Sequence, residues 1–183
     1  STVSNLSYIL LAACLMTQSG LTAALAHMLF HALIKITLFF CAGAVLVKTE
    51  RTQIEDLRGM AKVMPFTCAT YTIGAISLMG TPLLPGFVSK WLIGSAAIET
   101  GTTLGMIGVA AILISAVLTA IYLMGPALSM YFRPLEGMEP TAKCDPGMRM
   151  KLPFAILAVS IVLCGVFSNQ IITLLTTLAA GVM

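Results

Sequence analysis

Charged residues are scarce in this chain. Of its 183 residues, 10 are Lys or Arg and 7 are Asp or Glu, together 9%, whereas 58% are hydrophobic. The mean hydropathy is +1.00. A soluble domain normally carries about 25% charged residues. The scarcity of charge therefore excludes an ordinary soluble domain and predicts an integral membrane protein that has lipid as its solvent.

Several common motifs are also missing. No run of Lys or Arg is interleaved with aromatic residues, so we expect no nucleic-acid partner. No two of the five cysteines form a CxxC pair, and nothing in the sequence is suited to ligate a haem or an iron–sulfur cluster. We therefore expect no metal and no cofactor, and we interpret most of the cysteines as small buried residues; they are Cys14, Cys41, Cys68, Cys144 and Cys164.

The start of the chain lacks both an initial Met and a basic segment followed by a short apolar core. We therefore expect no signal peptide. We also expect the start to be internal, in a processed chain or in part of a longer one.

The charges gather in two short stretches. Of the 17 charged residues, 14 fall in 48–62 and 133–151. We expect these stretches to be solvent-exposed loops of a single membrane domain that spans 1–183. The remaining three are Lys35, Lys90 and Glu99, of which Glu99 is the only acid expected within the membrane, at the end of an apolar segment.

Apolar segments between the loops predict an all-α fold with about five to six transmembrane helices, one of them interrupted. A spanning helix needs about 20 residues, which the segments 21–47, 103–132 and 153–183 provide, whereas 87–98 is too short. Shorter or adjoining segments are 6–16 and 65–79, and Pro126 is expected to kink 103–132.

A cluster of helix-breaking residues separates two of these segments. Pro82, Pro85 and Gly86 lie within seven residues, and such a cluster interrupts a helix. In transporters, interrupted helices often mark the ion site. A plain tight turn between two helices is the alternative, and the sequence leaves both open. A second candidate break lies at 99–102.

The most informative segment contains His27, His31 and Lys35. Their spacing of four residues places all three on one helix face, spread over about 80° and rising about 12 Å along the axis. Lys35 lies just beyond the midpoint of 21–47, deep in the bilayer, where a lysine costs roughly 3 kcal/mol. That cost is tolerable if Lys35 faces the protein interior. Histidine and buried lysine both exchange protons readily, so the three predict a proton relay.

Other interpretations of these residues stay open. The two histidines can be core residues that bond across helices. They can also bind zinc, but no third ligand has a convincing spacing. Lys35 can be a structural ion-pair partner, although no partner is evident nearby. Lys90, next to Trp91, is either an interfacial anchor or a second proton or cation station beside the helix break.

The residues resemble a known family. The sequence STVSNLSY at 1–8 resembles a helix end in the antiporter-like subunits of respiratory complex I. The sequence HMLFHALIKITLFFCAG at 27–43 closely resembles the family's H-x3-H-A-x2-K-x3-F-x2-A-G helix. The sequences LRG at 57–59, MP at 64–65, IGAISLMGTP at 73–82 and GFVSKW at 86–91 also match. The family includes subunits of NADH:quinone oxidoreductase, Mrp-type cation/proton antiporters and energy-converting membrane hydrogenases.

The resemblance implies a fold and roles for single residues. In such proteins two inverted repeats of five helices each form a half-channel. Lys35 matches the central lysine of the second half-channel, His27 and His31 its companion histidines, and Lys90 the lysine from which the proton leaves. The glutamate–lysine pair of the first half-channel is absent, so the chain resembles the C-terminal half of a subunit, or a split version of it.

We therefore predict a proton-translocating, antiporter-like subunit of a redox-driven membrane complex of the NADH:quinone oxidoreductase or hydrogenase type. The chain itself has no redox site. An Mrp-type Na⁺/H⁺ antiporter module and a structural assembly subunit are the alternatives. The expected partners are the lipid bilayer and other membrane subunits, including whatever supplies the missing N-terminal half-channel. The expected location is the inner membrane of a prokaryotic cell.

Overall fold

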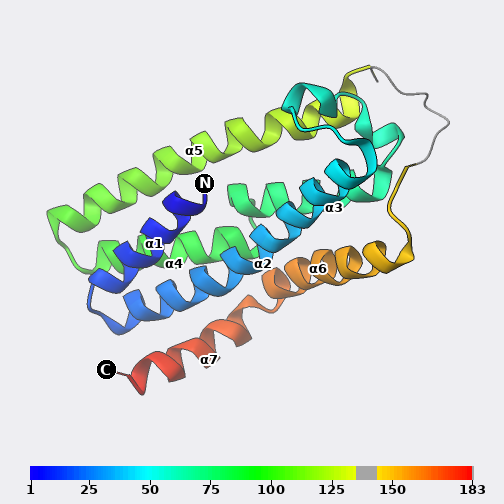
Figure 1. Ribbon diagram of the computed structural model, residues 1–183. Coiled ribbons are helices and arrows are strands. Elements are labelled where there is room, and N and C mark those ends of the chain that lie inside the picture. The colour runs from blue at the N-terminus through cyan, green and yellow to red at the C-terminus, as the bar shows by residue number, and fades with distance from the viewer. Residues whose placement is uncertain (135–143, 183) are drawn as a thin grey trace.

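The computed structural model describes residues 1–134 and 144–182, and every regular element in them is a helix. Seven α-helices are joined by turns, and two 3₁₀ helices, Ile54–Leu57 and Met60–Lys62, lie between α2 and α3 (Figure 1). The α-helices are α1 (Thr2–Cys14), α2 (Gln18–Thr49), α3 (Pro65–Met79), α4 (Pro85–Glu99), α5 (Thr103–Phe132), α6 (Met148–Val166) and α7 (Ser168–Ala180).

Local sequence explains where several helices begin. The Thr17 hydroxyl accepts a hydrogen bond from the Gly20 N–H at 3.0 Å, and the Thr102 hydroxyl accepts one from the Gly105 N–H at 3.1 Å. Threonine at this position satisfies an otherwise unpaired N–H of the first turn. Pro65 and Pro85 open α3 and α4, where the fixed φ of proline suits the helix and its missing N–H costs nothing.

Helix α2 forms the centre of the bundle and contacts α1, α3, α4, α6 and α7. Its 32 residues extend over about 48 Å at 1.5 Å per residue. Helix α5, with 30 residues, is similarly long and contains Pro126. Both helices, together with α6, are long and apolar enough to cross a membrane. Large apolar side chains such as Leu113 and Ile121 are more than 60% exposed on α5, as a helix facing lipid requires.

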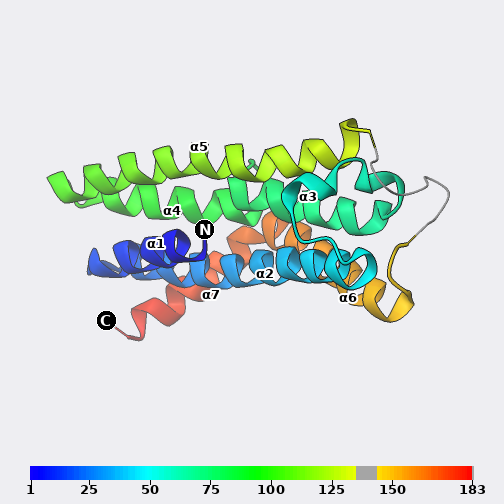
Figure 2. The same ribbon diagram turned by 45° about the horizontal axis from the view of Figure 1, so that its top comes forward.

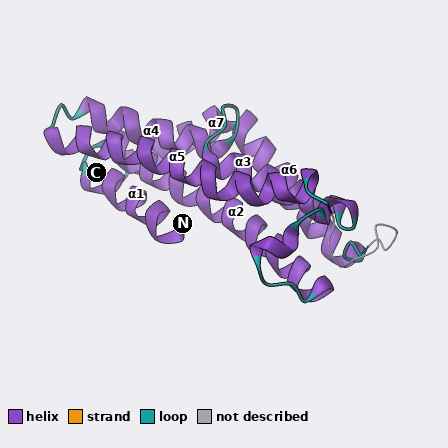
Figure 3. Ribbon diagram, turned by 90° about the horizontal axis from the view of Figure 1, so that it is seen from above, coloured by secondary structure: helices purple, strands orange, loops and turns teal. Residues whose placement is uncertain are grey.

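Two pairs of helices each run roughly end to end along the bundle. Helix α3 occupies one half of its length and α4 the other, and α6 and α7 repeat this arrangement (Figures 1, 2 and 3). The 15 residues of α4 are too few to cross alone. The interruption at 80–84 therefore lies near the middle of the bundle, at the position where the proline and glycine cluster predicts a break.

The second interruption differs from the sequence prediction, which treats 153–183 as one segment and expects a single interrupted helix. The helical segment begins earlier, at Met148, and it is divided at Phe167. Phe167 has φ −96° and ψ 23°, outside the helical geometry. No proline or glycine pair marks this break, which lies beside the first interruption.

The two interruptions touch each other. A Cβ atom on Gly165 would collide with the carbonyl oxygen of Leu83 and lie 3.0 Å from Cα of Leu84. A Cβ atom on Gly86 would likewise collide with the Ser77 carbonyl and lie 3.6 Å from the Ile34 side chain. Glycine allows these close backbone approaches. The first interruption therefore lies level with Ile34, near the midpoint of α2.

The first loop is only partly exposed to solvent, contrary to the prediction for 48–62. Met60 is completely buried, in a cluster with Val63 and Met64. The loop packs against the bundle through Met60, with Leu57 and Ala61 packed beside it. In the second loop, Glu136, Glu139 and Lys143 lie outside the described residues.

The described end of the second loop anchors helix α3. The Asp145 carboxylate accepts hydrogen bonds from the Phe66 N–H at 3.2 Å and the Thr67 N–H at 3.4 Å, and lies 3.9 Å from Nζ of Lys151. A carboxylate at this position stabilises the positive end of a helix. Asp145 therefore joins the second loop to the beginning of α3.

Candidate functional site

Five buried polar residues form a central polar cluster near the middle of the bundle. Their side chains come from α1, α2 and α4, and each is at most 9% exposed: Asn5, His27, His31, Ser89 and Lys90. Burying polar groups in an apolar bundle costs free energy unless they are hydrogen-bonded. The arrangement of their partners therefore decides what the cluster can do.

Both ring nitrogens of His27 are hydrogen-bonded. Nε2 lies 3.2 Å from Oδ1 of Asn5, and Nδ1 lies 2.9 Å from Oγ of Ser89. The Asn5 amide nitrogen donates to the Ser1 carbonyl at 2.8 Å, which directs the amide oxygen toward His27. Because that oxygen can only accept, Nε2 carries the proton in the neutral ring. His27 is thus held in one tautomer and has no nitrogen left for a metal ion.

Ser89 can satisfy His27 in either protonation state. When Nδ1 has no proton, the Ser89 hydroxyl donates to it. When Nδ1 is protonated it donates to Oγ of Ser89, whose hydrogen then turns to the Pro85 carbonyl at 3.2 Å. A rotation of one hydroxyl therefore lets His27 gain or lose a proton without leaving a buried group unpaired.

His31 continues the cluster toward Lys35. Its ring stacks on His27 with centroids 5.9 Å apart and planes 8° apart. Its Nε2 is buried and, within residues 1–134 and 144–182, has no hydrogen-bond partner. This nitrogen can exchange a proton with a water molecule or with a neighbouring side chain.

Lys35 is placed differently from the two histidines. It is half-buried, and its Nζ lies 5.6 Å from the centroid of the Phe39 ring. Phe39 itself is 65% exposed. The three predicted relay residues therefore share one helix face, but Lys35 lies at its edge, beside a surface that this chain leaves open.

Lys90 is buried at the helix interruption. Its Nζ donates hydrogen bonds to the carbonyl oxygens of Leu78 at 2.8 Å and Met79 at 3.1 Å. These are the last two carbonyls of α3. The anchor interpretation, which requires Lys90 at the lipid headgroups, does not fit this position. The adjacent Trp91 is 66% exposed and alone faces outward.

The interrupting residues organise this region. Pro82 lies in the non-helical segment, Pro85 begins α4, and Gly86 permits the contact with Ser77. The segment orients α4 so that Ser89 faces His27 while Lys90 reaches back to α3. Pro82, Pro85 and Gly86 therefore position the site without taking part in its hydrogen bonds through their side chains.

Sequence reasoning missed Asn5, Ser89 and the two carbonyls at the end of α3. Ser89 stands next to Lys90, and a hydroxyl side chain at that place in an apolar helix indicates a buried hydrogen-bonding residue. Asn5 has a similar signal in α1. The carbonyls carry no signal in the sequence, because only the fold brings them to Lys90.

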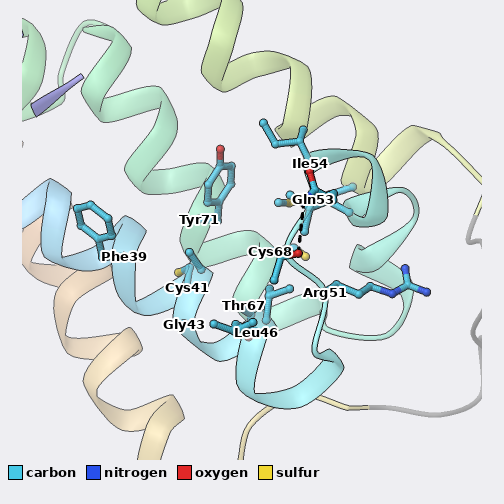
Figure 4. A pocket seen from close by; sticks show the side chains of 15 residues that line it. Phe39, Cys41, Gly43, Leu46, Arg51, Gln53, Ile54, Thr67, Cys68 and Tyr71 are labelled. Atoms are coloured by element: carbon cyan, nitrogen blue, oxygen red, sulfur yellow. Dashed lines mark hydrogen bonds between the residues drawn. The ribbon is translucent and has the colours of Figure 1, made fainter.

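Two openings lie away from the cluster. A cavity of about 490 Å³ is lined mainly by apolar side chains of α2, α3 and the first loop, including Phe39, Cys41 and Tyr71 (Figure 4). A smaller opening of about 300 Å³ contains Glu99, which accepts a hydrogen bond from Ser19 at 2.8 Å. Among the described residues, no three His, Cys, Asp or Glu side chains gather as metal ligands would.

Comparison with known proteins identifies one family and several relatives in membrane complexes. Residues 1–119 match the family described as NADH:quinone oxidoreductase/Mrp antiporter, TM. The NADH-quinone oxidoreductase subunit N of Desulforudis audaxviator (strain MP104C) is 33% identical over 94% of this chain and 36% of its own length. Hydrogenase-4 component B of Escherichia coli (strain K12) is 39% identical over 50% of this chain and 15% of its own length.

Solved structures share the fold. A chain of the Mrp complex from Dietzia sp. DQ12-45-1b superimposes with a TM-score of 0.86, at 23% identity, over 97% of this chain and 40% of that chain. A chain of the membrane-bound sulfane sulfur reductase, an archaeal respiratory membrane complex, gives 0.78 at 32% identity, over 90% and 32%. The chain spans well under half the length of the curated relatives it matches.

Proposed function

This chain belongs to the NADH:quinone oxidoreductase/Mrp antiporter transmembrane family, and on that premise we propose that it translocates protons, or a coupled cation, through its buried His and Lys side chains. It acts as an antiporter-like subunit of a redox-driven membrane complex of the NADH:quinone oxidoreductase or hydrogenase type. Related chains belong to such complexes, which supports other membrane subunits as partners and the prokaryotic inner membrane as the location.

The observation that carries the proposal is the hydrogen-bonded series Asn5–His27–Ser89. Its members are buried, and the Ser89 hydroxyl can satisfy His27 with or without the extra proton. A purely structural histidine needs no such provision. In this pathway the proton passes between His27, His31 and Lys35 on α2, and Lys90 forms the other end at the helix interruption.

The position of Lys35 supports a role for a partner in the pathway. Lys35 lies near the midpoint of α2, where a permanent charge facing lipid is costly. Since this chain gives it no oxygen partner among the described residues, we propose that another subunit or the missing half-channel covers the face of Lys35 and Phe39. Lys35 then receives or delivers the proton at the boundary between the two halves.

The test compares Lys35→Ala with Lys35→Arg in the complex that contains this chain, reconstituted in sealed vesicles. Alanine removes the protonatable group together with its burial cost, so the complex should assemble. Arginine keeps the charge but cannot release its proton in a protein. Both variants should lose at least about ten-fold in proton translocation.

Lys48→Ala is the matched control, since Lys48 lies exposed at the end of the same helix and should translocate normally. Complex content is measured alongside by native electrophoresis. Proton translocation at the wild-type rate by Lys35→Arg would contradict the proton-carrier role. A structural ion pair predicts the reverse pattern, with arginine tolerated and alanine impairing assembly.

The Mrp-type Na⁺/H⁺ antiporter module is the second candidate, favoured by the family description and by the shared fold. It differs in what supplies the energy, because a Na⁺ gradient then replaces the redox reaction. Proton movement that follows an imposed Na⁺ gradient without electron donor would select this candidate. Normal translocation by both Lys35 variants would instead support a structural assembly subunit.

A further inference from the structure

The carbonyl groups at the end of α3 divide into two pairs. The last four carbonyls of a helix have no partner within the helix. Here the Ser77 carbonyl accepts from the Gly80 N–H at 3.1 Å and the Ile76 carbonyl from the Thr81 N–H at 3.2 Å. Gly80, with φ +100°, makes this turn possible. The remaining pair, Leu78 and Met79, is satisfied by Lys90 alone among the described residues.

Lys90 behaves here as a tethered cation. Its ammonium is a compact point charge, placed against two oxygens at the negative end of a helix dipole. Lys90 is only 9% exposed, so water screens this attraction weakly. The geometry is that of a cation held by backbone carbonyls, except that the cation belongs to a side chain.

One further group lies in the same turn of α3. The Lys90 side chain passes beside Gly80, where a Cβ atom would lie at ordinary contact distances of 3.6 Å from Cδ and 3.8 Å from Nζ. The Ser77 hydroxyl, in the same final turn, is completely buried and has no hydrogen-bond partner in the described part of the chain.

We propose that the carbonyls of Leu78 and Met79 form a binding site for a free alkali cation, Na⁺ or K⁺. Lys90 occupies this site in the present structure, and the site becomes accessible when the Lys90 side chain withdraws. Backbone carbonyls at broken helices are suitable ligands for such ions. The lysine and the free cation exclude each other, since they use the same oxygens. This inference rests on the proposed function and names its cation site.

The exclusion gives a physical link between two ions. If the site holds the free cation, the charge of Lys90 has to move away, toward Ser89 and His27 or out of the pathway. If Lys90 returns, the cation leaves. Two ligands that compete for one site are coupled by free energy, so cation binding at α3 and proton occupancy near His27 influence each other.

The experiment removes the tethered cation and asks whether a free one replaces it. The complex carrying Lys90→Ala is purified in sodium-free and potassium-free choline chloride. Thermal midpoints are then compared in NaCl, KCl and choline chloride at equal ionic strength. We expect Na⁺ or K⁺ to raise the midpoint of Lys90→Ala by about 2–4 °C over choline, and that of the wild type by much less. Bound ²²Na⁺, or ⁸⁶Rb⁺ in place of K⁺, should increase by about one ion per complex.

Lys35→Ala is the matched control, because it removes a lysine at mid-depth that has no carbonyl partner among the described residues. It should show no such cation effect. Lys90→Met retains a stem that extends about as far as Cε of lysine and lacks only the ammonium group that occupies the carbonyls. It therefore decides the question if Lys90→Ala does not assemble. Lys90→Arg keeps a charge on the carbonyls and should bind no additional ion.

Equal cation effects in the wild type, Lys90→Ala and Lys90→Met would overturn the proposal, and so would an equal effect in Lys35→Ala. These measurements use no translocation assay. Failure of the cation site therefore leaves the proton pathway standing, whereas loss of the proton pathway is detected by the Lys35 variants.

Discussion

Lys90 and Lys35 lie at similar depth on neighbouring helices, yet their surroundings have little in common. Lys90 is buried and donates to two carbonyl oxygens, beside the Ser89–His27 hydrogen bond. Lys35 is half-buried and has the Phe39 ring near its charge. The chain therefore completes the environment of one lysine by itself and leaves the other at an open face.

The surroundings of the two lysines illustrate two ways in which a helical bundle tolerates charge within the membrane. At Lys90 the helix interruption supplies unpaired carbonyls, and the lysine satisfies them, so each group lowers the cost of the other. At Lys35, α2 is an uninterrupted helix, so the neighbouring carbonyls take part in hydrogen bonds within the helix. An interrupted helix can therefore bind a cation with its backbone, whereas an intact helix has to rely on neighbouring side chains.

The largest effect is expected where the interruption is packed. Gly86→Val would push a side chain into the Ser77 carbonyl and separate α3 from α4. We expect a loss of more than about 3 kcal/mol in stability, or failure to assemble. Gly94→Val is the control, because a Cβ atom at Gly94 of the same helix has no neighbour within 4 Å. Thermal midpoints and complex content measure both, and equal stability of the two variants would show that the close contact is unimportant.

The next prediction contrasts the two lysines directly. Lys90→Met leaves the Leu78 and Met79 carbonyls unpaired and should cost about 1.5–3 kcal/mol in choline chloride. Lys35→Met removes a costly charge without breaking a hydrogen bond and should change stability by less than about 1 kcal/mol, or raise it. Thermal unfolding of the assembled complex gives both values. Similar losses of stability for the two variants would show that the carbonyl hydrogen bonds of Lys90 do not distinguish it from Lys35.

A smaller effect is expected for the hydroxyl beside His27. Ser89→Ala removes the group that accommodates both protonation states, so proton translocation should fall roughly ten-fold, corresponding to about 1.4 kcal/mol. Ser89→Thr retains the hydroxyl and should restore most of the rate. Initial rates in sealed vesicles measure this effect. A Ser89→Ala variant as fast as Ser89→Thr would mean that His27 does not use the hydroxyl.

The smallest effect concerns the beginning of α3, the end opposite to Leu78 and Met79. Asp145→Ala removes the hydrogen bonds to the Phe66 and Thr67 N–H groups and should cost about 1 kcal/mol. Lys151→Ala breaks only the partly exposed 3.9 Å ion pair and should cost a few tenths of that. Thermal midpoints of the two variants should therefore rank in this order, and the opposite order would assign the stabilisation to the ion pair.

Much of the fold follows from the pattern of the sequence. The bounds of α3 and α5 correspond to the apolar segments 65–79 and 103–132. The prediction of an all-helical membrane protein is confirmed, and so is membership of the antiporter-like family. The interruption at 80–84 was visible because proline and glycine act locally. The division at Phe167 was not, because no proline or glycine pair marks it. Gly165, two residues earlier, packs against the Leu83 backbone, a contact that only the fold creates.

The order of residues is enough to identify the groups that are available: two histidines and a lysine at helical spacing on α2, and a lysine next to a helix break. Helical periodicity and the cost of charge in lipid are local properties, so residue order is sufficient to infer them. The pairing of these groups follows from the packing of the helices. This packing joins Asn5 and Ser89 to His27, directs Lys90 to the carbonyls of α3, and leaves Lys35 at the edge. Those contacts depend on where separate helices meet, and backbone carbonyls are chemically alike in every residue, so no sequence pattern marks the two that Lys90 binds.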